Sequence, residues 1–300
     1  MVVERLDLLN SNENVIKIKL CGDGTLVGRT RKLVNFAFTV INETDRAKSA
    51  TGTYTIGIFE VNNENYHALE KFIPVAALSL EHFDKITIKN KEFKIEKFFS
   101  GDLKFINIVR GLKSCSSSHP CPFCSTHVRE FALNSDNLAS QNPRTILTNI
   151  NKHDELLGYK HIPILSWIES NHYIPDILHL YLRITDVLQN LLLKEIHKLD
   201  KSNSNKITSR PNLFKYIKFL QKKCKINKPY YIDKTGNLCV RQFTGDEKKR
   251  IFDKIRISKL FPNMSDSKKI EEIWLSFNEI QIYLYILYFV YILILVDFVQ

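Results

Sequence analysis

The N-terminal third of the chain alternates between apolar and polar positions in a way that predicts β-strands. Residues 15–21 (VIKIKLC), 33–41 (LVNFAFTVI) and 53–61 (TYTIGIFEV) carry this pattern, and polar segments separate them. The first run meets residues 22–25 (GDGT), whose composition is typical of a turn. The spacing predicts an antiparallel meander of three consecutive strands.

Helical periodicity begins after the third strand. Apolar residues recur at helical spacing through residues 65–83, and a further helix is predicted over 103–112. Between them, two β-type runs at 86–88 and 93–99 predict a hairpin. The clearest amphipathic helix covers residues 174–199. Periodicity alone therefore predicts a mixed α/β or α+β domain.

The remainder of the chain is helical and basic. Helices are predicted at 211–223, 245–260 and 267–279, and a hairpin at 228–240. Residues 201–260 hold 17 Lys and Arg against 4 Asp and Glu, a net +13, so the rest of the chain sums to −2 within a total of +11. A basic tract of this kind favours an anionic partner, either a nucleic acid or an anionic membrane surface.

The C-terminal segment is strongly apolar. Residues 282–296 (IYLYILYFVYILILV) contain only aliphatic residues, phenylalanine and tyrosine. This run is shorter than the ~20 residues that a spanning helix needs. A tilted membrane anchor over residues 280–299 is the alternative interpretation.

Two acidic residues stand where strands are expected to end. Asp23 and Asp102 each follow an apolar strand and a glycine. Carboxylates on neighbouring strand ends can hold Mg²⁺ or Mn²⁺, and two such ions can activate water and stabilise the leaving oxygen in phosphodiester cleavage. The alternative is ordinary turn chemistry, because Asp beside Gly is common in turns.

The cysteines suggest a metal. Cys121 and Cys124 form a Cys-x-x-Cys pair that can occupy two of the four positions around zinc, and Cys115, His119 and His127 could complete a local site. Free thiols in a loop or a redox pair are the alternatives, although a redox pair lacks its usual strand–helix context. The charged N-terminus shows no apolar signal-peptide segment, so a reducing compartment is expected.

Polar residues also line the long predicted helix. Asp176, His179 and Arg183 are spaced to share one face of it. They form either a further part of a functional site or a helix N-cap with a solvated polar face.

Five short motifs are more specific as an ordered series than any one of them alone. They are GDG at 22–24, VNFAFTV at 34–40, FFSGD at 98–102, CPFC at 121–124 and IPDILH at 174–179, in that order. Over roughly residues 15–200 this series resembles the catalytic core of the V(D)J recombinase and its Transib-type transposon relatives, which are DD(E) transposases.

The resemblance implies an RNase H-like fold: a mixed sheet with flanking helices, a zinc-knuckle-like insertion and a helical C-terminal region. It implies Mg²⁺- or Mn²⁺-dependent cleavage and transfer of DNA strands, with Asp23 and Asp102 as the first two metal-binding acids. It also implies a structural Zn²⁺ with Cys121 and Cys124 as two of its ligands.

The chain departs from this family pattern in two respects. The family closes its zinc site with a later His-x4-His pair, but no histidine follows His197 here. The third catalytic acid of the family is a glutamate after that pair, and none of Glu271, Glu272 and Glu279 follows one. We therefore expect an incomplete, inactive fragment with a weak zinc site.

DNA is the expected partner and the nucleus the expected location, with a homodimer as a further expectation. The alternatives are a non-catalytic nucleic-acid-binding protein and a membrane-anchored protein with a cytosolic domain. The basic residues expected to contact DNA are Arg29, Arg31, Lys32, Lys104, Lys222, Lys223, Lys248, Lys249 and Arg250. The expected divisions are a core at 1–113, a cysteine-containing insertion at 114–160, a core-flanking helix at 161–200, a basic helical region at 201–279 and an apolar tail at 280–300.

Overall fold

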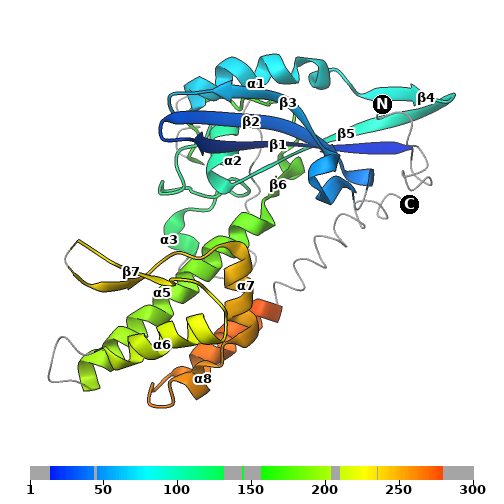
Figure 1. Ribbon diagram of the computed structural model, residues 1–300. Coiled ribbons are helices and arrows are strands. Elements are labelled where there is room, and N and C mark those ends of the chain that lie inside the picture. The colour runs from blue at the N-terminus through cyan, green and yellow to red at the C-terminus, as the bar shows by residue number, and fades with distance from the viewer. Residues whose placement is uncertain are drawn as a thin grey trace. The chain divides into compact units, whose positions relative to one another are not determined.

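The structure is a computed structural model with two compact units, Met1–Asp176 and Ile177–Gln300 (Figure 1). It describes residues 14–43, 46–131, 144, 157–203, 210–234 and 236–279. Within each unit the described residues combine helices with β-strands, so the mixed α/β class predicted from periodicity is confirmed.

A mixed six-stranded sheet organises the first unit. Its order is β3-β2-β1-β5-β4, with β6 paired to the end of β5. The strands are β1 (Val15–Val27), β2 (Arg31–Val40), β3 (Thr53–Glu60), β4 (Lys85–Ile88), β5 (Lys91–Gly101) and β6 (Tyr173–Pro175). The predicted meander of β1, β2 and β3 and the predicted hairpin of β4 and β5 are both confirmed. β1 and β6 each run parallel to β5.

The predicted turn at residues 22–25 is wrong. β1 continues through it, with Asp23 opposite Asn35 and Gly24 opposite Val34 of β2, and the chain reverses only at 28–30. Backbone pairing with β2 overrides the local turn preference. The reversal uses Gly28, whose φ of +67° lies in the left-handed region that glycine tolerates.

Two helices pack against one face of this sheet. α1 (Tyr66–Glu81) begins after Asn65, whose side chain accepts a hydrogen bond from the Ala68 amide. α2 (Leu103–Val109) follows β5 directly. The shorter helices of the unit are η2 (Ile41–Glu43), η3 (Arg46–Lys48), η4 (Ala50–Gly52), α3 (Val128–Phe131) and η6 (Ser170–His172).

The core of the first unit lies between the sheet and these helices. Leu20, Phe36 and Phe99 on the strands meet Ile73 of α1 and Phe105 of α2, and all are fully buried. Each such side chain stabilises the fold by about 1.5–3 kcal/mol through removal from water. This packing fixes the position of α2 at the end of the sheet.

The second unit is mainly helical. It contains α5 (Ile177–Asn203), α6 (Pro211–Lys222), α7 (Gly245–Lys254), α8 (Ile257–Leu260), a helical segment at 267–279 and a hairpin of β7 (Tyr230–Ile232) and β8 (Leu238–Val240). Its core gathers residues from several helices, including Leu192, Tyr216 and Phe252. α5 therefore belongs with the basic region, not with the first unit as a core-flanking helix.

Two predicted helices have different bounds. The long helix begins at Ile177 instead of 174, because residues Tyr173–Pro175 form β6. The helix predicted over 245–260 is divided into α7 and α8, with Ile255 in extended conformation between them. None of the helices within the described residues is long and apolar enough to cross a membrane. The apolar segment 282–296 lies outside those residues.

Candidate functional site

The first two expected acids lie at the same end of two adjacent central strands, Asp23 within β1 and Asp102 directly after β5. β1 and β5 pair in parallel up to Cys21 opposite Ser100. Asp23 lies two residues beyond Cys21, and Asp102 lies two residues beyond Ser100, so the acids occupy equivalent positions at one end of the sheet. Neighbouring strands are separated by about 4.8 Å, which places the two backbones within reach of a shared ligand.

A third acid occupies the same level of the sheet. β6 pairs in parallel with β5 through Gly101 opposite Pro175, and Asp176 follows at once. The Asp176 amide donates a hydrogen bond to the Gly101 carbonyl oxygen at 3.3 Å, which continues the pairing by one step. Asp23, Asp102 and Asp176 thus lie at corresponding positions on three neighbouring chain segments.

These acids also share one face of the sheet. Side chains alternate between the faces of a strand, and Leu20, Phe36 and Phe99 occupy the face that packs on the helices. By this alternation Asp23 and Asp102 belong to the opposite face, together with Cys21. Asp23 is exposed, whereas Asp102 and Asp176 are half-buried.

Burial and neighbouring charges both change the pKa of the Cys21 thiol. Its pKa is raised, chiefly by burial, and the nearby Lys19 ammonium opposes this shift. The negative charges of Asp176 and Asp23 raise the pKa further, so both carboxylates are close enough to act on the same sulfur atom. The Lys19 ammonium on the same strand offsets part of the charge of these two carboxylates.

Asp102 has a second role in the structure. Its Oδ1 accepts a hydrogen bond from the Phe105 amide at 2.6 Å, so it is the N-cap of α2. This contact holds the carboxylate at the end of β5. Its Oδ2 takes no part in this cap and is the oxygen that we consider for a metal.

The donor chemistry of the three acids fits Mg²⁺ or Mn²⁺, which prefer carboxylate oxygens on rigid elements. Within the described part of the chain, no group of three or more His, Cys, Asp or Glu side chains is arranged to hold a metal ion.

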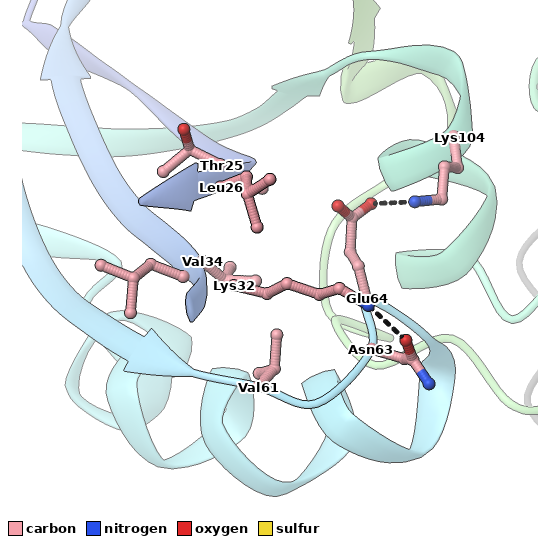
Figure 2. Close-up of a pocket in the computed structure, with 10 residues that line it drawn as sticks. Thr25, Leu26, Lys32, Val34, Val61, Asn63, Glu64 and Lys104 are labelled. Atoms are coloured by element: carbon pink, nitrogen blue, oxygen red, sulfur yellow. Dashed lines mark hydrogen bonds and ion pairs between the residues drawn. The ribbon is translucent and has the colours of Figure 1, made fainter. Parts of the chain in front are cut away.

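A cleft of about 490 Å³ opens at the same end of the sheet (Figure 2). It is lined by β1, β2, α2 and the segment between β3 and α1. Glu64 crosses it to form an ion pair with Lys104 at 3.1 Å, and the Lys32 ammonium donates to Asn63 Oδ1 at 2.7 Å. Gly24 makes this possible, since a Cβ there would lie 2.0 Å from Glu64 Oε2.

Two of the expected DNA-contacting lysines, Lys32 and Lys104, line the cleft, whereas Asp23, Asp102 and Asp176 are not among its lining residues. Lys104 lies two residues after Asp102, and Lys32 lies on the strand next to β1. Arg29 at the β1–β2 turn is exposed, and Arg31 forms an exposed ion pair with Glu60 at 2.8 Å. Basic side chains therefore surround the end of the sheet that carries the acids.

In the second unit the expected DNA contacts fall into two groups. Lys222, Lys223 and Lys249 are exposed. Lys248 is instead 4% exposed, and its ammonium pairs with Asp186 at 2.7 Å and donates to the Leu182 carbonyl. Including Lys248 among the phosphate contacts is therefore wrong, because it faces inward.

Arg250 is half-buried and also serves the fold. Its guanidinium donates to the carbonyl oxygens of Cys224 and Lys225, both at 3.1 Å. It therefore fastens α7 to the segment after α6, and less of its side chain is left for a phosphate.

The Cys-x-x-Cys turn is held by an arginine. Arg144 is 3% exposed and donates to the carbonyl oxygens of Cys121 at 3.0 Å and Cys124 at 2.9 Å. Cys121 Sγ accepts a hydrogen bond from the Phe123 amide at 3.4 Å. Burial raises the pKa of the Cys121 thiol, which disfavours the thiolate in the metal-free protein.

The other suggested zinc ligands divide into two places. Cys115 Sγ accepts from Asn107 Nδ2 at 3.2 Å, while the rings of His119 and His127 lie edge to face with centroids 5.1 Å apart. These side chains belong to no metal-ligand group among the residues that the structure describes. The zinc site remains a prediction.

A shared face of Asp176, His179 and Arg183 stays a prediction, and Asp176 stands at the position of the N-cap that was its alternative. Asp176 precedes α5, because Tyr173–Pro175 belongs to the sheet, whereas His179 and Arg183 are exposed on the helix. The structure therefore associates Asp176 with the two strand-end acids. In the sequence, the only indication of β6 before Asp176 is the short run Tyr173–Pro175, which fits the start of a helix equally well.

No protein-family model matches the chain, and no curated protein matches it either.

Proposed function

We propose that the first unit is a metal-dependent phosphodiesterase of the RNase H-like, DD(E)-type transposase class, acting on DNA. The observation that carries this proposal is the common register of Asp23 in β1, Asp102 directly after β5 and Asp176 directly after β6. The strand order, with an antiparallel meander followed by a helix and a strand parallel to the first, supports the RNase H-like assignment.

In this proposal each acid has a separate task. Asp23 and Asp176 supply oxygens from the two flanking strands, and Asp102 supplies the oxygen that does not cap α2. When bound, Mg²⁺ or Mn²⁺ supplies the Lewis acidity that in-line displacement at phosphorus needs. Lys32 and Lys104, at the same end of the sheet, are the candidates to contact more distant phosphates of the strand after release from Asn63 and Glu64.

Asp176 replaces the missing late glutamate in this scheme. The expectation of an inactive fragment depended on finding only two acids. With a third acid at the same end of the sheet, we propose that the unit has the carboxylates for metal binding.

The test is a nicking assay with the full chain, labelled duplex DNA and Mg²⁺ or Mn²⁺. Asp23→Asn, Asp102→Asn and Asp176→Asn should each abolish nicking and weaken metal affinity, by roughly a hundredfold. Asp84→Asn is the matched control, because Asp84 is exposed and pairs with Lys97, well before the end of β5. Nicking that survives in Asp176→Asn would remove this residue from the site, and wild-type protein without metal-dependent nicking would overturn the proposal.

A second candidate is DNA binding without cleavage. It is favoured by the net +13 of residues 201–260, most of whose described lysines are exposed. Binding of this kind weakens steeply with salt because phosphate contacts release counterions. Salt-sensitive binding by a chain that never nicks DNA would support this candidate over the first.

A further inference from the structure

The hairpin of the second unit exposes an unusual strand. Every residue of β7 is exposed: Tyr230 by 40%, Tyr231 by 52% and Ile232 by 67%. β8 differs, because Leu238 and Val240 are half-buried against the core of the unit. The hairpin, labelled β7 in Figure 1, thus has an anchored strand, β8, and an outer strand, β7. Tyr230 and Tyr231 are both exposed and, as neighbours in a strand, lie on opposite faces of the hairpin.

An exposed two-stranded hairpin is only marginally stable on its own. This one is clamped at its base. Arg241 donates to the carbonyl oxygens of Lys228 at 3.0 Å and Asn227 at 3.2 Å, and pairs with both carboxylate oxygens of Glu247 at 2.7 and 2.9 Å. The pairing holds the pKa of Glu247 down at about 2. The Arg241–Glu247 ion pair therefore helps to hold the hairpin in position.

Arg210 fastens the opposite strand. Its guanidinium donates to Asn237 Oδ1 at 3.2 Å and to the Leu238 carbonyl oxygen at 3.4 Å. At the turn, Asp233 Oδ1 accepts from the Asn237 amide at 2.8 Å, so the one acidic side chain of the hairpin is engaged with its own backbone. The outer strand is thus preorganised, which lowers the entropy cost of binding.

The surroundings of the outer strand are basic. The exposed lysines on the hairpin and on the segment that leads into it are Lys222, Lys223, Lys225, Lys228 and Lys234. They belong to the tract with a net +13 over residues 201–260. By charge complementarity, the partner is a polyanion. Exposed tyrosine rings beside these lysines also favour a partner that offers flat aromatic groups for stacking.

We propose that the exposed rings of Tyr230 and Tyr231, one on each face of β7, stack on unpaired bases of a nucleic-acid strand whose phosphates are held by Lys228 and Lys234. Base–aromatic stacking of this kind is tolerant of sequence and adds to electrostatic binding. A duplex fits less well, since its bases already stack on one another. This inference rests on the proposed function only for the class of partner, a nucleic acid. Beyond that function, it gives the second unit a preference for unpaired strands.

The test is anisotropy of a labelled single strand of about 16 nucleotides and of its duplex, over a salt series. The full chain carries Asp23→Asn, and EDTA is present. Tyr230→Ala with Tyr231→Ala should weaken single-strand binding by roughly tenfold or more without changing the salt slope. The duplex should be affected much less. Tyr230→Phe with Tyr231→Phe is the matched control and should bind like the parent chain, because it keeps both rings.

Lys228→Ala with Lys234→Ala should have a different signature. The slope of log affinity against log salt should fall by about 1.4, since two phosphate contacts are lost. Equal loss of single-strand and duplex binding in the alanine variant of the tyrosines would overturn the stacking proposal, and so would no loss at all. Because metal and cleavage are excluded, failure here is distinguishable from failure of the nicking assay.

Discussion

At the scale of single residues, two glycines of β1 allow other side chains to approach the strand. A Cβ at Gly22 would lie 2.2 Å from Cε1 of Phe105, and one at Gly24 would lie 2.0 Å from Oε2 of Glu64. The two neighbours differ in mobility. Phe105 is 1% exposed and packed in the core, whereas the Glu64 carboxylate borders the cleft. Replacement by alanine should therefore lower the free energy of unfolding by different amounts at the two positions.

We predict that Gly22→Ala lowers the free energy of unfolding by about 1–3 kcal/mol, because the buried ring cannot move aside without strain. Gly24→Ala should cost less, because Glu64 can swing out of the cleft and release Lys104. Denaturant unfolding of both variants measures the difference. A larger loss for Gly24→Ala would show that the Glu64–Lys104 pair is held more rigidly than the core.

At the scale of elements, Asp102 at the junction between β5 and α2 contributes both to the stability of the fold and to the proposed metal site. Asp102 ends the strand, caps the helix and faces the same side of the sheet as Asp23. A substitution there changes two properties at once. The choice of replacement can separate them.

We predict that Asp102→Ala lowers the free energy of unfolding by about 1 kcal/mol through loss of the cap. Asp102→Asn should remain near wild-type stability, because an amide oxygen can also accept from the Phe105 amide. Both variants should lose metal-dependent stabilisation in thermal unfolding. If Asp102→Asn still gained stability from Mg²⁺ or Mn²⁺ as wild type does, Asp102 would not be a ligand.

The sequence predicted most of the elements of the first unit, because long alternating runs determine them. It failed where the deciding partner lies far along the chain. Residues 22–25 have turn composition, but pairing with β2 keeps them extended. β6 has only three residues, too few for a period, and is defined by its pairing with β5. The role considered for Asp176 depends on that pairing, so local patterns could not indicate it.

At the scale of the whole molecule, each buried cluster is made by one unit. The clusters around Phe99 and Ile95 contain residues of the first unit alone, and the cluster around Phe252 contains residues of the second alone. Within the described residues the two units therefore have separate cores. Their stabilities should respond separately to core truncation.

We predict that Phe99→Ala lowers the stability of the first unit, and Phe252→Ala that of the second, by about 3–5 kcal/mol each. Hydrogen exchange followed by mass spectrometry resolves the effect by peptide. Faster exchange should be confined to peptides of the unit that carries the substitution. Acceleration throughout both units would indicate one cooperative structure.

The parallel pairing at the centre of the sheet also determines how the first unit can fold. Strand β1 must find β5, about 80 residues later, and β5 must find β6 after a further stretch of similar length. Loops of this length close slowly compared with the local contacts of helices. We therefore expect these pairings to form after the local contacts of the helices, and a ribosome must have synthesised Asp176 before the three acids can reach corresponding positions.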